Sequence, residues 1–157
     1  MEAEKLYDLA KREAKKKTPN YEKTAGLLEK AHVKGEVKAT CALADWYMRG
    51  VFFKKNRKRG LQYYRTAAKG LNVDAMFNLG VFYENGCNLK KNEKRAFEYY
   101  LAAAVQGKGG SGKWALLEVM RCFFHGIGIE KNKRLAIMLR SICDRYGVDF
   151  DDDRYDD

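Results

Sequence analysis

The chain has 157 residues, 46% of them hydrophobic, and a formal net charge of +10, so it is long enough to form one domain with a buried core. No segment approaches the roughly 18 consecutive apolar residues that a membrane-spanning helix needs, and the charged N-terminus is unlike a secretory signal. Ala, Leu, Lys and Tyr are frequent and there is one proline, which favours helix.

The chain repeats itself with a period near 36 residues. Residues 37–70 align with residues 73–106, a third copy follows at a shift of 40, and a weaker copy precedes the first. A period of this length is typical of a solenoid, in which stacked copies bury one another's apolar faces. The identities at the first shift include Ala39 with Ala75, Leu43 with Leu79, Tyr47 with Tyr83, Gly50 with Gly86, Lys54-Lys55-Asn56 with Lys90-Lys91-Asn92, and Tyr63-Tyr64 with Tyr99-Tyr100.

Each copy is predicted to form two helices joined by a loop. In the second full copy, the apolar positions between residues 73 and 85 recur at the spacing of one helical face. Gly86 follows as a helix-ending glycine. Asn92 stands where the N-cap of the next helix belongs, as do Asn56 and Asn132 in the other copies. We therefore expect about four helix-turn-helix units, at residues 1–35, 36–71, 72–107 and 112–147.

The stretch GKGGSGKW, residues 107–114, matches the phosphate-binding pattern G-x-x-x-x-G-K-[ST] up to its last letter, where Trp114 replaces the hydroxyl residue. A P-loop follows a strand, whereas residues 96–105 have the pattern of a helix. The four residues that lengthen the shift from 36 to 40 fall in this stretch. We therefore expect an enlarged turn between two helices and no nucleotide hydrolysis. Weak anion binding by the glycine amides, Lys108 and Lys113 stays open.

The repeat resembles the Sel-1-like repeat, a relative of the tetratricopeptide repeat, over about residues 21–147. In the best copy the residues that carry the resemblance are Ala75, Leu79-Gly80, Tyr83, Gly86, Asn92, Arg95-Ala96, Tyr99-Tyr100 and Ala103-Ala104. The last copy departs most from the pattern, at Val119-Met120, Phe123 and Leu139-Arg140, as a capping repeat would. The resemblance implies an all-α, α/α superhelical solenoid whose first helices line a concave face. It also implies an adaptor or scaffold that binds proteins, in bacteria often in signalling, host contact or toxin systems. Some secreted members carry a disulfide in each repeat, and this chain lacks that cysteine pair.

By analogy with tetratricopeptide repeats, the second, fifth, ninth and twelfth positions of each first helix are expected to face inward. These positions mix aromatic and charged side chains, as protein-binding surfaces do. Packing between neighbouring first helices is the alternative for Phe77 and Leu117. The predicted partner-binding residues are Lys38, Asp45, Met48, Asp74, Phe77, Val81, Glu84, Trp114, Arg121 and Phe124, and Cys41 and Leu117 complete the rows.

The loop before each second helix is rich in lysine and arginine. Stacking brings equivalent loops to one edge, which we call the basic ridge. Cations near a helix N-terminus are mildly unfavourable, so capping does not explain them. The ridge is either a site for an acidic partner (protein, nucleic acid or membrane phosphate) or a solvated positive edge. Its residues are Lys54, Lys55, Arg57, Lys58, Arg59, Lys90, Lys91, Lys94, Arg95, Lys131, Lys133 and Arg134.

The last ten residues, 148–157, form a separate acidic tail. They hold six aspartates and one arginine, a net charge of −5, so the rest of the chain carries +15. A disordered, solubilising tail is the preferred interpretation, and a cover for the basic ridge is the alternative.

No set of residues predicts catalysis or metal binding. There is no H-E-x-x-H motif, no serine elbow and no Cys-His-Asp set. Structural zinc needs closely spaced ligand pairs, and the chain offers none, so we expect no enzyme, no cofactor and no metal. Free thiols buried in a reducing compartment are the better interpretation of the cysteines. The cysteines are Cys41, Cys87, Cys122 and Cys143, and the two histidines, His32 and His125, lie far apart in the sequence.

The sequence as a whole predicts a small cytoplasmic adaptor that binds another protein, an acidic one if the basic ridge is used. One alternative is an immunity protein that neutralises a toxin or effector. The other is a nucleic-acid binder that uses the basic ridge. Aromatic residues do not interleave with its lysines and arginines, apart from Phe52 and Phe53, which gives base stacking little support.

Overall fold

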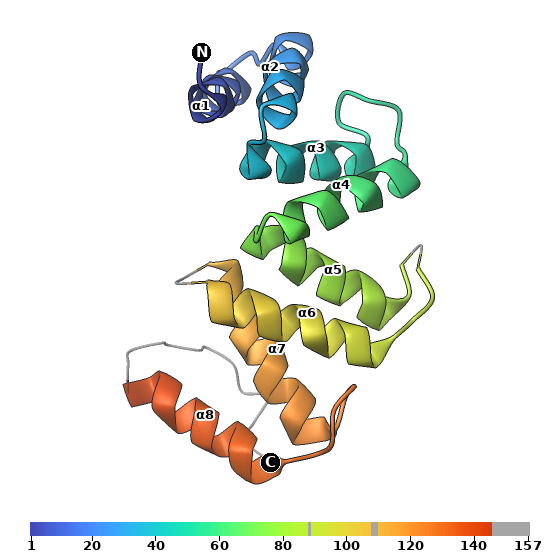
Figure 1. Cartoon of the computed structure of the whole chain (residues 1–157), viewed down its shortest axis with the longest axis vertical. Helices are drawn as coiled ribbons and strands as arrows, with labels where there is room; N and C mark the ends of the chain where they lie inside the picture. Colours follow the sequence, from blue (N-terminus) through green and yellow to red (C-terminus); the bar gives the residue numbers. More distant parts are fainter. Residues whose placement is uncertain (88, 108–109, 146–157) are drawn as a thin grey trace.

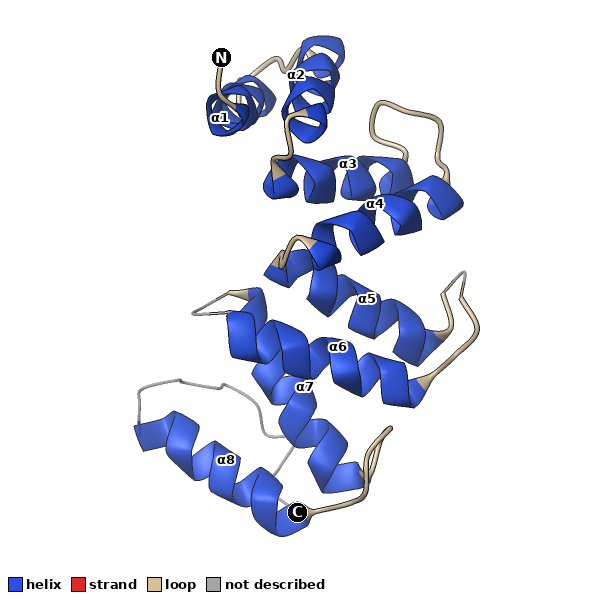
Figure 2. Ribbon diagram, viewed as in Figure 1, coloured by secondary structure: helices blue, strands red, loops and turns tan. Residues whose placement is uncertain are grey.

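The computed structural model describes residues 1–87, 89–107 and 110–145. These residues form eight helices and no strand, stacked one after another along the longest axis of the molecule (Figures 1 and 2). The predicted all-α superhelical solenoid is confirmed. The helices are α1 (Ala3–Ala14), α2 (Tyr21–Val33), α3 (Val37–Arg49), α4 (Arg57–Lys69), α5 (Val73–Asn85), α6 (Glu93–Gln106), α7 (Ser111–His125) and α8 (Lys133–Arg145).

The helices pair as hairpins, each made of an odd-numbered A helix and an even-numbered B helix. Gly50, Gly86 and Gly126 end α3, α5 and α7 in the left-handed conformation, with φ of 74°, 68° and 80°, which glycine adopts without steric cost. At the start of α6, the side chain of Asn92 accepts a hydrogen bond from the amide of Arg95 at 2.9 Å. Asn56 caps α4 in the same way. The predicted ends of these hairpins are confirmed.

Small residues at the helix crossings let the backbones approach closely. Ala44, Ala67, Ala75 and Ala103 are fully buried. A Cβ added to Gly80 of α5 would lie 2.5 Å from the ring of Tyr100 of α6, so glycine is needed where this ring packs. The core therefore runs through the stack as connected clusters between successive helices.

Fewer residues separate α6 from α7 than the sequence predicts. α6 ends at Gln106 and α7 begins at Ser111, so four residues separate them, one more than separate α4 from α5. The other inserted residues lengthen α6 at its end and α7 at its start, because α7 begins at Ser111 while the repeat would place its first residue at Lys113. Gly107 and Gly112 then touch, since a Cβ on Gly112 would lie 2.5 Å from the Cα of Gly107. Lys108 and Gly109 lie outside the described residues.

The outer face of α8 does not have the polar character of a capping repeat. Ile137, Met138 and Ile142 are 62%, 52% and 41% exposed. The equivalent of Ile137 one repeat earlier is Phe97, which is 7% exposed and packs against Phe123 of α7. The expectation of a capping repeat therefore fails at this face. The acidic tail lies outside the described residues.

Among the helices that the structure describes, none contains an apolar stretch of the length that spanning a bilayer requires.

Candidate functional site

The A helices form one face of the stack, and a pocket of about 400 Å³ opens on it between α1, α3 and the start of α5. Three of the predicted partner-binding residues, Lys38, Asp45 and Asp74, line this pocket. We call this surface the A-helix face. The residues that line its pocket are Tyr7, Lys38, Cys41, Ala42, Asp45, Leu71, Asn72, Val73 and Asp74.

Leu71 holds a strained backbone at the rim of this pocket. Its φ is 62°, and among the described residues it is the one non-glycine with positive φ. Gly35 stands at the equivalent position one repeat earlier, with φ of 85°. A left-handed conformation costs a residue with a Cβ about 1–2 kcal/mol, and strain of this kind clusters at binding sites. The side chain of Leu71 is 58% exposed, so it offers an apolar contact beside the pocket.

Both aspartates of the pocket are oriented by neutral hydrogen-bond donors. The hydroxyl of Tyr64, on α4, donates to Asp45, and that of Ser111, at the start of α7, donates to Asp74 at 2.5 Å. Burial raises the pKa of the Cys41 thiol to about 12, and the charges of Asp45 and Asp74 add to the rise. The charges of both carboxylates therefore reach the Cys41 thiol, so the part of the pocket beside this thiol is negative.

The contact of Asp74 with Ser111 also bears on the anion hypothesis for GKGGSGKW. A carboxylate of the chain lies beside the first residue of α7, where the amides of a helix start would attract a phosphate. Asp74 would repel that phosphate. The segment before this start is α6, a helix, whereas a P-loop requires a strand there.

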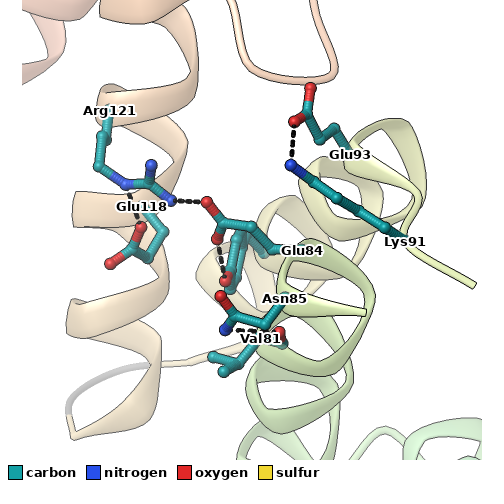
Figure 3. A network of polar contacts seen from close by, with 8 residues as sticks. Val81, Glu84, Asn85, Lys91, Glu93, Glu118 and Arg121 are labelled. Carbon is teal, nitrogen blue, oxygen red and sulfur yellow. Dashed lines mark hydrogen bonds and ion pairs between the residues drawn. The ribbon is translucent and has the colours of Figure 1, made fainter. Parts of the chain in front are cut away.

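A network of ions links α5 to α7 further along the A-helix face (Figure 3). Arg121 donates to Glu84 of α5 at 2.5 Å and to Glu118 of its own helix at 2.6 Å. Tyr100 of α6 donates to the other oxygen of Glu84 at 2.8 Å. Burial alone would lower the pKa of Arg121, but its two carboxylate partners raise it. Arg121 and Glu84 therefore fix one repeat against the next, and each side chain stays 20% exposed.

The other predicted A-helix residues differ in exposure. Trp114 is 56% exposed, whereas Phe124 is 7% exposed with Lys133 over its ring at 4.6 Å. The expectation that Phe124 faces a partner therefore does not fit its burial. Leu117 is 2% exposed, as in the alternative of packing between helices. The remaining residues of the predicted set are partly exposed, namely Met48, Phe77 and Val81.

The loops before α4, α6 and α8 lie along one edge of the stack (Figure 1), and all twelve residues of the basic ridge are exposed. Five of them lie in these loops, as expected, whereas the other seven lie in the first turns of α4, α6 and α8. A Cβ on Gly128 of the third loop would lie 2.1 Å from the carbonyl oxygen of Glu93, so this loop touches the start of α6. Some ridge cations have partners within the chain. Lys91 pairs with Glu93 at 2.8 Å, and Arg59 lies 4.6 Å from the centre of the Tyr47 ring.

Aromatic side chains from outside the loops contact two arginines of the basic ridge. Arg59 and Arg95 each lie over a tyrosine of the A helix in the same repeat, Tyr47 and Tyr83. Each of these rings stacks in turn on a B-helix tyrosine, as Tyr83 does on Tyr99 at 5.6 Å. These tyrosines lie in the helices, so the sequence of the loops alone does not show the contact. The signal was present, because both tyrosines and the arginine recur at the shift of 36.

The cysteines and acidic residues do not gather as metal ligands. Among the described residues, no group of three or more His, Cys, Asp or Glu could hold a metal ion. All four cysteines are free, and three of them are buried.

Comparison with known proteins identifies the repeat. The family model of the Sel1 repeat matches residues 37–70, 73–108 and 115–139, more than half of the chain. No curated protein matches. The region before residue 37 has the same helical hairpin in the structure, although the family model does not match it.

Several solved structures share the fold. A Sel1 repeat protein from Oxalobacter formigenes is 26% identical, with a TM-score of 0.70 over 82% of this chain and 91% of its own. A protective antigen of uropathogenic Escherichia coli with an SLR fold is 22% identical, with a TM-score of 0.81, and the match covers 93% of this chain and 31% of the antigen. An immunity protein from Pseudomonas aeruginosa is 18% identical, with a TM-score of 0.57 over 94% of this chain and 69% of its own.

Proposed function

Because this chain belongs to the Sel1 repeat family, whose members in general act as non-catalytic scaffolds for protein interaction, we propose that it binds a partner protein on its A-helix face. The observation that carries the proposal is the pocket that Lys38, Asp45 and Asp74 line on this face. Three helices from three repeats supply its walls, so the pocket exists only in the stacked array.

The chemistry of the A-helix face fits a protein segment. Leu71 and Trp114 offer exposed apolar contacts, and Asp45 and Asp74 offer oriented carboxylates. Such a mixture, in which aromatic and charged groups are held in place before binding, reduces the entropy lost on association. The ion network of Arg121 supports the proposal because it holds α5 and α7 in one relative position.

The proposal is tested by capturing partners from a lysate of the source cells on the immobilised chain. The wild type is compared with a Lys38→Glu/Trp114→Ala variant and with a Lys54→Glu/Lys55→Glu variant of the ridge. All four side chains are exposed, so both variants should keep the fold, whereas Phe124 is buried and is a poor choice. We expect a protein that the first variant loses and the second retains. Loss in the ridge variant alone would contradict the proposal.

The same experiment separates the alternative roles. The likeness to an immunity protein is one of fold, and a neutralising role requires that the captured protein be a toxin or effector whose activity the chain blocks. A nucleic-acid role requires that the captured material be a nucleic acid, which nuclease digests and protease does not. In that case the ridge variant would release it, because phosphate contacts depend on lysine and arginine. A cytoplasmic location stays a prediction, which the free cysteines support.

A further inference from the structure

A second pocket opens on the ridge side of the stack, where α5 meets α6. It has a volume of about 280 Å³ and is lined by Tyr83, Arg95, Glu98, Tyr99 and Ala102. Arg95 belongs to the basic ridge, and its guanidinium lies 5.6 Å from the centre of the Tyr83 ring. The pocket is therefore distinct from the one on the A-helix face.

The guanidinium of Arg95 is held in place before any ligand arrives. Its Nη1 donates to the hydroxyl of Tyr83 at 3.3 Å, and the Asn92 cap fixes the backbone of Arg95, from which the side chain extends. The rings of Tyr83 and Tyr99 stack with an angle of 11° between their planes, which limits the rotamers of both. An ordered guanidinium loses little entropy when it binds an anion.

Arg65 of the preceding B helix, α4, brings a second positive charge to the same hydroxyl. Burial alone would raise the pKa of Tyr83, but hydrogen bonds and charge from Arg95 and Arg65 lower it below its ordinary value. Within the described part of the chain, neither arginine forms an ion pair with a carboxylate. Arg95 therefore lines the pocket, and the charge of Arg65, from the neighbouring repeat, acts on the same tyrosine hydroxyl.

The junctions before and after this one are built differently at the same positions. At the preceding junction, Glu29 stands where Arg65 does, beside Tyr47, Arg59 and Tyr63. The pKa of Tyr47 is raised by burial, and Glu29 opposes the effect of Arg59. At the following junction the four positions hold Leu101, Phe123, Leu135 and Leu139. One junction is thus balanced in charge, one carries two cations, and one is apolar.

We propose that Arg65, Arg95 and the hydroxyl of Tyr83 bind the carboxylate of an acidic segment in a partner protein. Guanidinium groups match carboxylates through paired, charge-assisted hydrogen bonds. Glu98 lines the pocket, and with the two arginines it leaves one net positive charge, which one carboxylate neutralises. The excess of positive charge in the chain attracts such a segment from a distance. The site does not depend on the A-helix face.

The test is titration calorimetry at low ionic strength with a blocked tetraglutamate peptide and with a tetraglutamine peptide as its control. We expect the first peptide to bind at one site and the second not to bind. Arg65→Gln should weaken binding about tenfold, the loss expected for a charge-assisted hydrogen bond. Glu98→Gln should tighten binding. Lys58→Gln removes the same charge from an exposed ridge residue outside the pocket and should change affinity less than about twofold.

The balanced junction provides a gain-of-function variant. Glu29 is exposed, and Glu29→Arg places two arginines around Tyr47, so it should raise the number of bound peptides from one to two.

Equal losses in Arg65→Gln and Lys58→Gln would overturn the proposal, because binding would then follow overall charge. Inorganic phosphate that binds more tightly than the peptide in an Arg65-dependent way would overturn the preference for carboxylate. Retention of the lysate partner by Arg65→Gln leaves the proposed A-helix site intact.

Discussion

The four cysteines differ in their surroundings. Cys87 is exposed, whereas Cys41, Cys122 and Cys143 are buried. Burial raises the pKa of Cys41 and of Cys122 to about 12, and the thiolate is the form that reacts. We therefore predict one fast-reacting thiol in the native protein with a disulfide-exchange reagent at pH 8, and four after denaturation. The fast reaction should vanish in Cys87→Ser. Two or more fast thiols in the native wild type would contradict the burial.

Two buried tyrosines should make the protein sensitive to alkaline pH. Burial raises the pKa of Tyr64 and of Tyr100, and hydrogen bonds to Asp45 and Glu84 raise both further. A folded pKa above the unfolded value of about 10 means that their contribution to stability is present below pH 10 and is lost as pH rises above it.

The test compares urea denaturation of the wild type and of Tyr64→Phe/Tyr100→Phe at pH 8 and at pH 10.5. The variant should be less stable at pH 8, by about 1 kcal/mol for each lost hydrogen bond. Its free energy of unfolding should then fall less between the two pH values, because phenylalanine does not ionise. An equal fall in both proteins would show that these tyrosines do not cause the pH dependence.

At the scale of the helix, glycine has different roles at different crossings. Gly112 opens α7 against the backbone of Gly107, whereas Gly26 lies in α2 with nothing within 4 Å of an added Cβ. Gly112→Ala should destabilise the protein by about 1–3 kcal/mol through overpacking. Gly26→Ala should stabilise it by about 0.5–1 kcal/mol through a lower entropy of the unfolded chain. Thermal denaturation of the two variants measures this, and equal effects would contradict the close contact.

The bounds of a helix were predictable where the sequence signals lie within one repeat. The range 73–85, its closing glycine and the Asn92 cap follow from local periodicity and capping chemistry. The start of α7 was not predictable. Comparing the third copy with the second shows that four residues are inserted, but it does not show whether they lengthen the turn or the helices. The Gly107–Gly112 contact decides this, and it joins two backbones across the turn.

The candidate sites were predictable to different degrees. The repeat register brought Lys38, Asp45 and Asp74 to one face, and they share a pocket. The burial of Phe124 was not predictable, since Lys133 reaches its ring from the next helix. The pairing of Arg95 with Tyr83 joins residues twelve positions apart through the hairpin, so no local motif shows it.

At the scale of the whole molecule, the stack separates two kinds of surface. The A-helix face carries a pocket with two oriented aspartates, and the ridge side carries a row of exposed cations and a pocket with arginines. Equivalent positions at successive junctions hold side chains of different charge and polarity, although each repeat has the same backbone fold. A repeat array of this kind offers several distinct contacts while every repeat keeps the same core.

Site-specific photo-crosslinking tests whether the partner lies on the A-helix face. A photoreactive phenylalanine derivative is placed at Lys38 in one variant and at Lys58 on the ridge in a second, since both side chains are exposed. Each variant is irradiated with the captured partner. We expect a covalent adduct from position 38 and none from position 58. An adduct from position 58 alone would place the partner on the basic ridge instead.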